Sequence, residues 1–214
     1  MKRRSLLTLV YLAAALVSSA SAAQFKALLI SKTDGWHHDS IAAGVTALQD
    51  LAKLHDVDLF GTEDTGRVIK DEWLKDHQVV NLLPTTGNIF NETEQDALTK
   101  FVNDGGGLVG IHRASGTEYG WDWYPKAMGH MFHIHPAVQA ATIEVLHYDF
   151  PGMDRFSQRF LATEKWYKFD ASRNDDLTYL LTVDEPTYVP KPIWGPRKVT
   201  AWVTSTPCSY SKNT

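Results

Sequence analysis

A histidine stands at the kind of turn where α/β proteins commonly carry their chemistry. In "GGGLVGIHRASG", residues 105–116, three glycines lead into a short apolar run, and His112 follows that run. Doubly wound proteins mount catalytic side chains at such strand ends, and a nucleophile at a sharp strand-to-helix turn is normally Ser or Cys. Histidine titrates nearest neutral pH, so the residue type suits proton transfer or metal ligation instead. Ser115 is expected to cap the next element.

Further histidines and a carboxylate lie at neighbouring strand ends. His38 follows the first predicted strand, Glu118 comes shortly after His112, and His135 lies in "GHMFHIHP". Catalytic zinc sites usually have three protein ligands and one open position, so His38, His112 and His135 are candidate ligands for a divalent metal such as zinc. The sequence has no HExxH motif and no cysteine ligands near these histidines. The alternative interpretation, polar loop residues bonded to backbone carbonyls, therefore stays open.

Aromatic side chains accompany the histidines, as they do in carbohydrate sites. Flat apolar rings match the C–H faces of sugars, although the same residues also fill the hydrophobic layer under loops. Trp121 and Trp123 alternate in "GWDWY", so one is expected to pack inward and the other to face the cleft. The aromatic residues concerned are Trp36, Tyr119, Trp121, Trp123 and Tyr124.

The elements that position these residues follow from hydrophobic periodicity. Short apolar runs predict strands, and helical spacing with polar caps predicts the helices between them. Strands and helices that alternate at this spacing predict a parallel sheet with right-handed crossovers, in which ligands bind outside the carboxyl ends of the strands. Strands are expected over residues 25–31, 57–63, 78–84 and 107–113, and helices over 39–56, 71–76 and 91–105. Asp39 or Ser40 is expected to cap the first helix, and Asn91 with Glu94 the last.

After residue 129 the pattern changes to strand-like runs in turn-rich surroundings. These runs cover residues 141–147, 165–170, 177–184 and 199–204. They either extend the sheet or fold over its functional edge.

The first 23 residues have the layout of a secretory signal. A basic start, an apolar core shorter than a membrane span and a small-residue cleavage site favour export over anchoring. We expect a secreted or periplasmic protein with no membrane contact after cleavage.

Without those residues, 18 Lys and Arg oppose 25 Asp and Glu, a net charge near −7 that argues against nucleic acid as a partner. The single cysteine, Cys208, rules out an internal disulfide, and Asn91 stands in a glycosylation sequon that matters only in a eukaryotic source.

Several motifs together resemble the ThuA-like, or trehalose-utilisation, family of the class I glutamine amidotransferase-like superfamily. They are "SKTDGWHHDSIAAGVTAL", "LPTTGNIFNETEQDALTKFVNDGGGLVGIHRAS", "TEYGWDWYPKAMG", "HPAVQAATIEV", "EKWYKF" and "LLTVDEPTY". The resemblance implies a flavodoxin-like sheet and a link to sugar metabolism. Amidotransferases carry a cysteine where this chain has His112, so amidotransferase activity is not expected.

The positions that match the family pattern, together with the aromatic residues near them, suggest roles. His112 and Glu118 would be catalytic, with Glu118 orienting His112 or sharing its proton transfer. A set of further residues would bind substrate: His38, Thr86, Trp121, His135 and Trp166. The expected partner is a small carbohydrate, namely a disaccharide or glycoside derivative such as a keto sugar, and the alternative is a sugar-binding protein without catalysis.

Two departures from the family pattern affect these expectations. Lys165 replaces a carboxylate of the family motif, which weakens any mechanism that needs an acid there. The end "VTSTPCSYSKNT" differs from the family's last strand and helix, so the chain is expected to be truncated. We therefore expect a domain over residues 24–204 and a divergent, disordered tail over 205–214.

Overall fold

The structure, a computed structural model, describes residues 23–169 and 175–191 and the backbone of residues 209–211. Its first half is a parallel sheet in the order β2-β1-β3-β4. The strands are β1 (Phe25–Ile30), β2 (Val57–Thr62), β3 (Val79–Leu82) and β4 (Gly107–Gly110). This confirms the predicted α/β, flavodoxin-like parallel sheet, with each strand ending one to three residues earlier than predicted.

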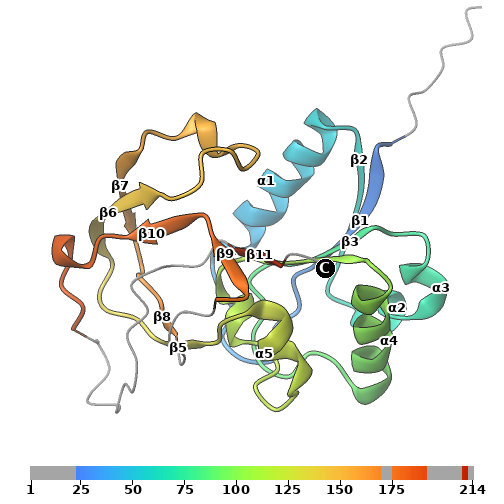
Figure 1. The fold of residues 1–214 in the computed structure, drawn as a ribbon. Helices are drawn as coiled ribbons and strands as arrows, with labels where there is room; N and C mark the ends of the chain where they lie inside the picture. The colour runs from blue at the N-terminus through green and yellow to red at the C-terminus, as the bar shows by residue number, and fades with distance from the viewer. Residues whose placement is uncertain (1–22, 170–174, 192–208, 212–214) are drawn as a thin grey trace, which may run out of the picture.

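Helices cover both faces of this sheet (Figure 1). They are α1 (Ile41–Leu54), α2 (Thr65–Val68), α3 (Asp71–Leu74), α4 (Glu92–Asn103) and α5 (Trp123–Met128). The main core packs apolar residues of β1 and β3, such as Leu28 and Leu82, against Val68 of α2 and Leu98 of α4. The apolar run of β1 is uninterrupted because a central parallel strand is buried on both of its faces.

The caps of the two long helices differ from each other. Asn91 Oδ1 accepts the Glu94 N–H at 3.0 Å and Glu94 Oε2 accepts the Asn91 N–H at 2.7 Å, so the predicted capping box is confirmed. Ser40 precedes α1 in a helical conformation and makes no side-chain cap bond, so the cap predicted for α1 is wrong at that residue. The single-turn helix α2 was not predicted, because four residues carry no periodic signal.

The second half consists of antiparallel strands in sheets separate from the first. The strands are β5 (Phe132–Ile134), β6 (Gln139–Val145), β7 (Arg159–Glu164), β8 (Lys168–Phe169), β9 (Leu177–Tyr179), β10 (Leu181–Val183) and β11 (Ser209–Ser211). The 3-10 helices η2 (Met153–Arg155) and η3 (Glu185–Thr187) lie between these strands, whereas the 3-10 helix η1 (His112–Gly116) follows β4. The pairings are β10-β6-β7, β5-β8 and β11-β9. Among the described residues these strands do not extend the parallel sheet, so the first of the two predicted alternatives, extension of that sheet, is not observed.

Both ends of the chain bear on the predicted boundaries. Residues 1–22, the predicted strand at 199–204 and residues 205–208 and 212–214 lie outside the described part. Residues 209–211, which were expected to be disordered, pair with β9 in antiparallel register, with Tyr210 opposite Thr178. In the described part of the chain, no helix is long and apolar enough to cross a membrane.

Candidate functional site

His112 occupies a strained turn directly after β4. Its backbone φ is +54°, in the left-handed region that residues with a side chain rarely adopt. The Ile111 N–H still donates to the Leu82 carbonyl at 2.9 Å, so the parallel pairing lasts until the residue before the turn. The turn exposes the His112 side chain at the carboxyl edge of the sheet. Strain of this kind persists only where surrounding contacts hold it, and it concentrates at functional sites.

The loops at this edge continue the pairing of the strands below them. Isolated bridges join Thr33 to Thr86 and Gly87 to Thr117. The Thr86 hydroxyl donates to the Trp36 carbonyl at 2.9 Å, and the Thr86 side chain is buried. Thr86 therefore clamps the β1–α1 loop to the β3–α4 loop, which differs from the substrate-binding role predicted for its side chain.

Three histidines from distant parts of the sequence meet around one tyrosine. The His38 and His112 ring centroids lie 5.1 Å apart. The Tyr167 ring stacks on His112 at 4.8 Å and on His135 at 5.9 Å, and the Tyr167 hydroxyl lies 3.2 Å from His112 Nε2. We call these four residues the histidine cluster. The structure thus brings together His38, His112 and His135 as the sequence predicted.

Tyr167 was missed as a site residue. It is buried just beyond β7, and it follows Trp166 in "EKWYKF", a motif in which only Trp166 was predicted to be a site residue. The aromatic neighbour Trp166 in the same motif was the signal that could have identified Tyr167 as a site residue.

The surroundings of the cluster keep its histidines neutral. Burial, with His112 and then the charges of Lys165 and Arg113 adding to it, lowers the pKa of His38 to about 4. The pKa values of His112 and His135 are lowered as well, mainly by desolvation. Desolvation also raises the pKa of the Tyr167 hydroxyl, which stays protonated at neutral pH. Neutral imidazoles can accept protons, so the cluster is suited to base catalysis.

Two cations border the cluster. The Arg113 guanidinium carbon lies 3.7 Å from the centroid of the Phe132 ring, and Phe132 in turn packs on Tyr167 at 4.4 Å. Lys165 is half-buried two residues before Tyr167. The positive charge of Lys165 is one reason why the pKa values of His38 and His112 are low.

Glu118 has a structural role rather than the predicted partnership with His112. Its Oε1 accepts the N–H groups of Ile89 and Phe90 at 2.6 and 2.9 Å, and its Oε2 accepts Gln95 Nε2 at 2.9 Å. The residue is buried, with a left-handed φ of +54°. Glu118 therefore holds the β3–α4 loop beside the site, and its oxygens are committed to that loop.

The two tryptophans predicted to bind substrate pack into the protein. Trp121 stacks on Trp123 at 4.8 Å, and both are partly buried against the main core, so the predicted division into one packed and one cleft-facing ring is not seen. Trp166 is buried, and its Nε1–H donates to the Gln139 carbonyl at 2.9 Å in the core of the antiparallel sheet. Sequence spacing could not distinguish these packed rings from exposed ones.

The donor set does not match a metal site in the described residues. No three His, Cys, Asp or Glu side chains there are arranged to hold a metal ion. The Tyr167 hydroxyl lies 3.2 Å from His112 Nε2, so this ring nitrogen already has a hydrogen-bond partner. The zinc site stays a prediction from sequence.

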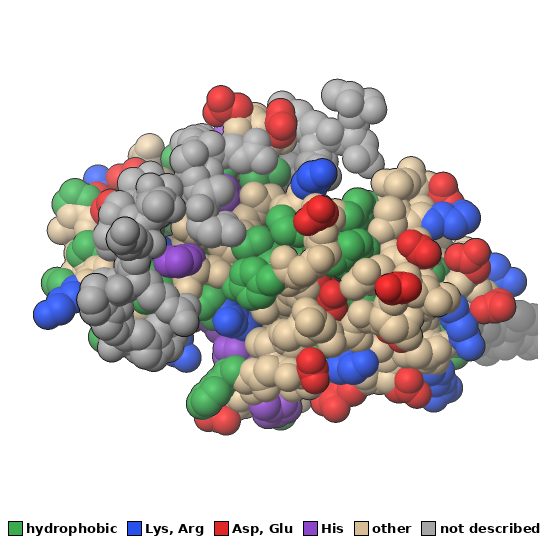
Figure 2. Space-filling view, turned by 90° about the horizontal axis from the view of Figure 1, so that it is seen from below, with side chains coloured by type: hydrophobic (Ala, Val, Ile, Leu, Met, Phe, Trp, Pro, Cys, Tyr) green, Lys and Arg blue, Asp and Glu red, His purple; other side chains and the backbone are tan. Residues whose placement is uncertain are grey.

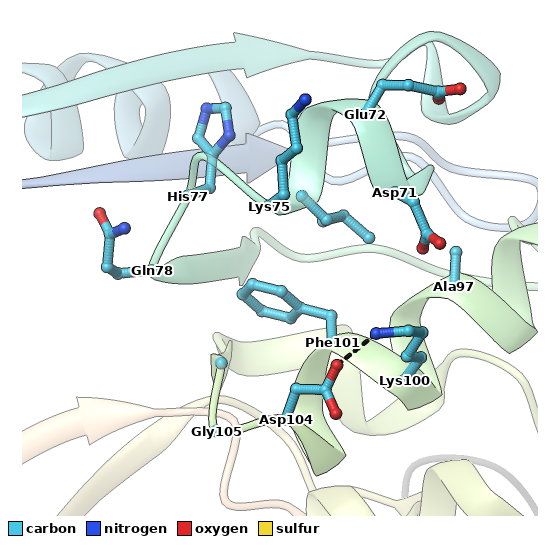
Figure 3. Close-up of a pocket in the computed structure, with 12 residues that line it drawn as sticks. Asp71, Glu72, Lys75, His77, Gln78, Ala97, Lys100, Phe101, Asp104 and Gly105 are labelled. Atoms are coloured by element: carbon cyan, nitrogen blue, oxygen red, sulfur yellow. Dashed lines mark hydrogen bonds and ion pairs between the residues drawn. The ribbon is translucent and has the colours of Figure 1, made fainter.

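Two hollows in the described part of the chain lie beside or away from the cluster. A groove of about 620 Å³ is bounded by α3 and α4 at the amino-terminal end of β3 and β4, with Phe101 pointing into it and the bonded pair Lys100 and Asp104 at its rim (Figure 3). A second hollow of about 610 Å³ lies at the carboxyl ends of β1, β2 and β3, next to the loop that Glu118 holds. Viewed from below, charged side chains of both signs crowd the side of α2 to α4, whereas histidines appear toward the antiparallel strands (Figure 2). Because ligands of open parallel sheets bind at the carboxyl edge, we take the histidine cluster and not the groove as the site.

Comparisons with known proteins agree with this architecture. A ThuA-like protein from Bacteroides uniformis superposes with a TM-score of 0.69 at 25% identity, covering 81% of this chain and 75% of its own. A second ThuA-like protein, from Parabacteroides merdae, gives 0.61 at 16% identity, covering 76% and 70%, and so supports the fold alone. A glutamine amidotransferase from Thermotoga maritima matches at only 0.47 and 12% identity, over 75% and 67% of the two chains.

No curated protein matched the sequence significantly. The family described as ThuA, trehalose utilisation, matches residues 26–212, which extends past the boundary predicted at residue 204. With its parallel sheet, its histidine turn and this match over most of its length, the chain belongs to the ThuA trehalose-utilisation family.

Proposed function

We propose that the chain processes a carbohydrate by acid/base chemistry, with His112 as the residue that moves the proton. The observation that carries this proposal is the histidine cluster itself. An exposed histidine with a lowered pKa stands at the carboxyl edge of the sheet, and a tyrosine hydroxyl lies 3.2 Å from its Nε2. Membership of the trehalose-utilisation family supports a disaccharide or glycoside derivative as the substrate class.

The electrostatics of the cluster indicate which step His112 performs. A neutral imidazole accepts a proton from the substrate, and the imidazolium then returns it to a substrate oxygen. Removing a proton from carbon leaves negative charge on an adjacent oxygen, and the nearby charges of Arg113 and Lys165 stabilise such charge. A keto sugar fits this step, because its carbonyl acidifies the neighbouring C–H bond.

Turnover by a His112→Ala variant tests the proposal. The wild-type chain is incubated with trehalose, other disaccharides and their keto derivatives, and the products are separated by chromatography. Loss of a general acid/base should lower turnover by about 10²- to 10⁴-fold. The control is His147→Ala, which removes a histidine that is exposed on the β6–β7 connection. Equal turnover by both variants would contradict the role of His112.

The second candidate function is sugar binding without catalysis. It is favoured by Glu118, whose carboxylate is engaged by Ile89, Phe90 and Gln95 and so leaves His112 without the predicted acidic partner. A chain that is stabilised by a disaccharide in thermal-shift experiments, and that converts no member of the panel, would support this second function.

We also propose export of the chain with removal of the first 23 residues. The basic start, apolar core and "ASA" cleavage sequence support this proposal. Mass spectrometry of the protein recovered outside the cytoplasm should find a mature N-terminus near Ala23. Recovery of the intact N-terminus, or of cytoplasmic protein alone, would contradict it.

A further inference from the structure

An exposed indole lies two residues before His38, a member of the histidine cluster. The Trp36 side chain is 73% exposed on the β1–α1 loop. Single exposed apolar residues are common on protein surfaces, so exposure alone indicates no function. What distinguishes Trp36 is the combination of its exposure with a fixed backbone and a position next to the candidate catalytic histidine.

The loop that carries Trp36 is held at several points. The Trp36 carbonyl accepts the Thr86 hydroxyl at 2.9 Å, and the Asp34 N–H donates to the Thr86 carbonyl at 2.8 Å. Gly87, with φ +78°, lies so close that a Cβ there would come within 3.0 Å of Asp34 and Gly35 atoms. A side chain on such a loop loses little backbone freedom when a ligand binds, which favours affinity.

The position of Trp36 relative to the cluster follows from the chain. His38 comes two residues later, so the two Cα atoms lie within about 7 Å of each other, and the His38 ring lies 5.1 Å from that of His112. Tyr119, another exposed aromatic residue, donates its hydroxyl to the Phe132 carbonyl and so borders the same cluster. Of the tryptophans near this face that the structure describes, Trp121 and Trp123 are partly buried against the core, whereas Trp36 is exposed.

We propose that Trp36 is a substrate-binding platform that stacks on the non-reacting ring of a disaccharide and so places the other ring against His112. An indole presents a large flat apolar face and a single N–H, which match the C–H face and the hydroxyl rim of a pyranose ring. The proposal rests on the proposed function for the identity of the ligand as a sugar. Trp36 is a positioning residue in this scheme, because it contacts the part of the substrate that does not react.

Calorimetric titration with trehalose, maltose and cellobiose tests the platform. Replacing Trp36 with Ala should weaken the disaccharide that binds best by about tenfold, and Trp36→Phe should restore most of the affinity because a ring is retained. The control is Tyr148→Ala, which removes an aromatic side chain that is 41% exposed in the antiparallel half, and its affinity should equal that of the wild type. Far-UV circular dichroism and thermal melts establish that each variant is folded.

Binding and turnover separate the two proposals. The platform is overturned if Trp36→Ala binds as tightly as the wild type, if Tyr148→Ala loses as much affinity, or if the wild-type chain binds none of the three disaccharides. If His112→Ala abolishes turnover while Trp36→Ala changes nothing, the proposed function stands and the platform is wrong. If no variant or wild type turns over any substrate while Trp36→Ala weakens binding, the platform stands and the catalytic proposal fails.

Discussion

The parallel and antiparallel halves of the molecule bury their strands in different ways. In β1 four consecutive residues, 27–30, are buried, whereas in β7 no residue is fully buried. A central parallel strand has protein on both faces, and an antiparallel strand commonly leaves one face in water. The histidine cluster draws on both halves: His38 and His112 follow parallel strands, and His135 and Tyr167 flank antiparallel ones.

The two halves make different contributions to the site. The parallel half supplies the strained turn at His112 and the buried carboxylate that holds its neighbouring loop. The antiparallel half supplies the Tyr167 ring and the Lys165 charge that modify the histidines. We therefore expect changes to the buried supports of the parallel half, such as Glu118, to act mainly on stability, and changes at the antiparallel rim, such as Lys165, to act mainly on proton affinity.

The largest effect is expected from removing the Glu118 carboxylate. Glu118→Ala deprives the Ile89, Phe90 and Gln95 N–H groups of their acceptor, and with each buried unpaired donor costing about 1–3 kcal/mol the loss should reach about 3–5 kcal/mol. The matched change in the antiparallel half is Glu144→Ala, which removes a surface ion pair with Arg159 and should cost no more than about 1 kcal/mol. Urea unfolding of both variants measures the difference, and equal losses would remove the distinction between the two halves.

An intermediate effect is expected from the pH dependence of His38. Its pKa falls from 6.5 to about 4 on folding, so the unfolded chain binds more protons between these values. The stabilising contribution is complete above pH 6.5 and is lost as the pH falls toward 4. A His38→Gln variant cannot titrate there, so its free energy of unfolding should fall less between pH 7.5 and 5 than that of the wild type. Parallel urea-stability curves for the two proteins would contradict the burial of neutral His38.

The smallest effect is expected from the cation at the antiparallel rim. Lys165→Met removes a positive charge that lowers the pKa of His112, so that pKa should rise, and solvent screening should keep the rise small. If His112 is the general base, the acid limb of the pH–rate profile moves to higher pH by the same amount. NMR titration of the His112 ring measures the shift, with Lys75→Gln at the far end of the sheet as the control. A shift in the control of similar size would show that net charge, rather than Lys165, is responsible.

Local patterns in the sequence determined the parallel sheet, the capping box of α4 and the turn at His112. Continuous apolar runs, helical spacing and the Asn91 and Glu94 pair are all signals within a few residues, and each reflects a local physical requirement. Because parallel strands place their carboxyl ends at one edge, the same signals also predicted that His38 and His112 would meet.

Only the tertiary structure decided what each candidate side chain contacts. Thr86, Glu118, Trp121 and Trp166 have the residue types of a binding site, yet their hydrogen bonds and rings are used inside the fold. Tyr167 reaches His112 across 55 positions of sequence, and Trp36 remains in water because neighbouring loops hold its backbone and leave its ring uncovered. Residue type and spacing determine what a side chain is capable of, whereas its burial and partners depend on contacts between segments that are distant in the sequence.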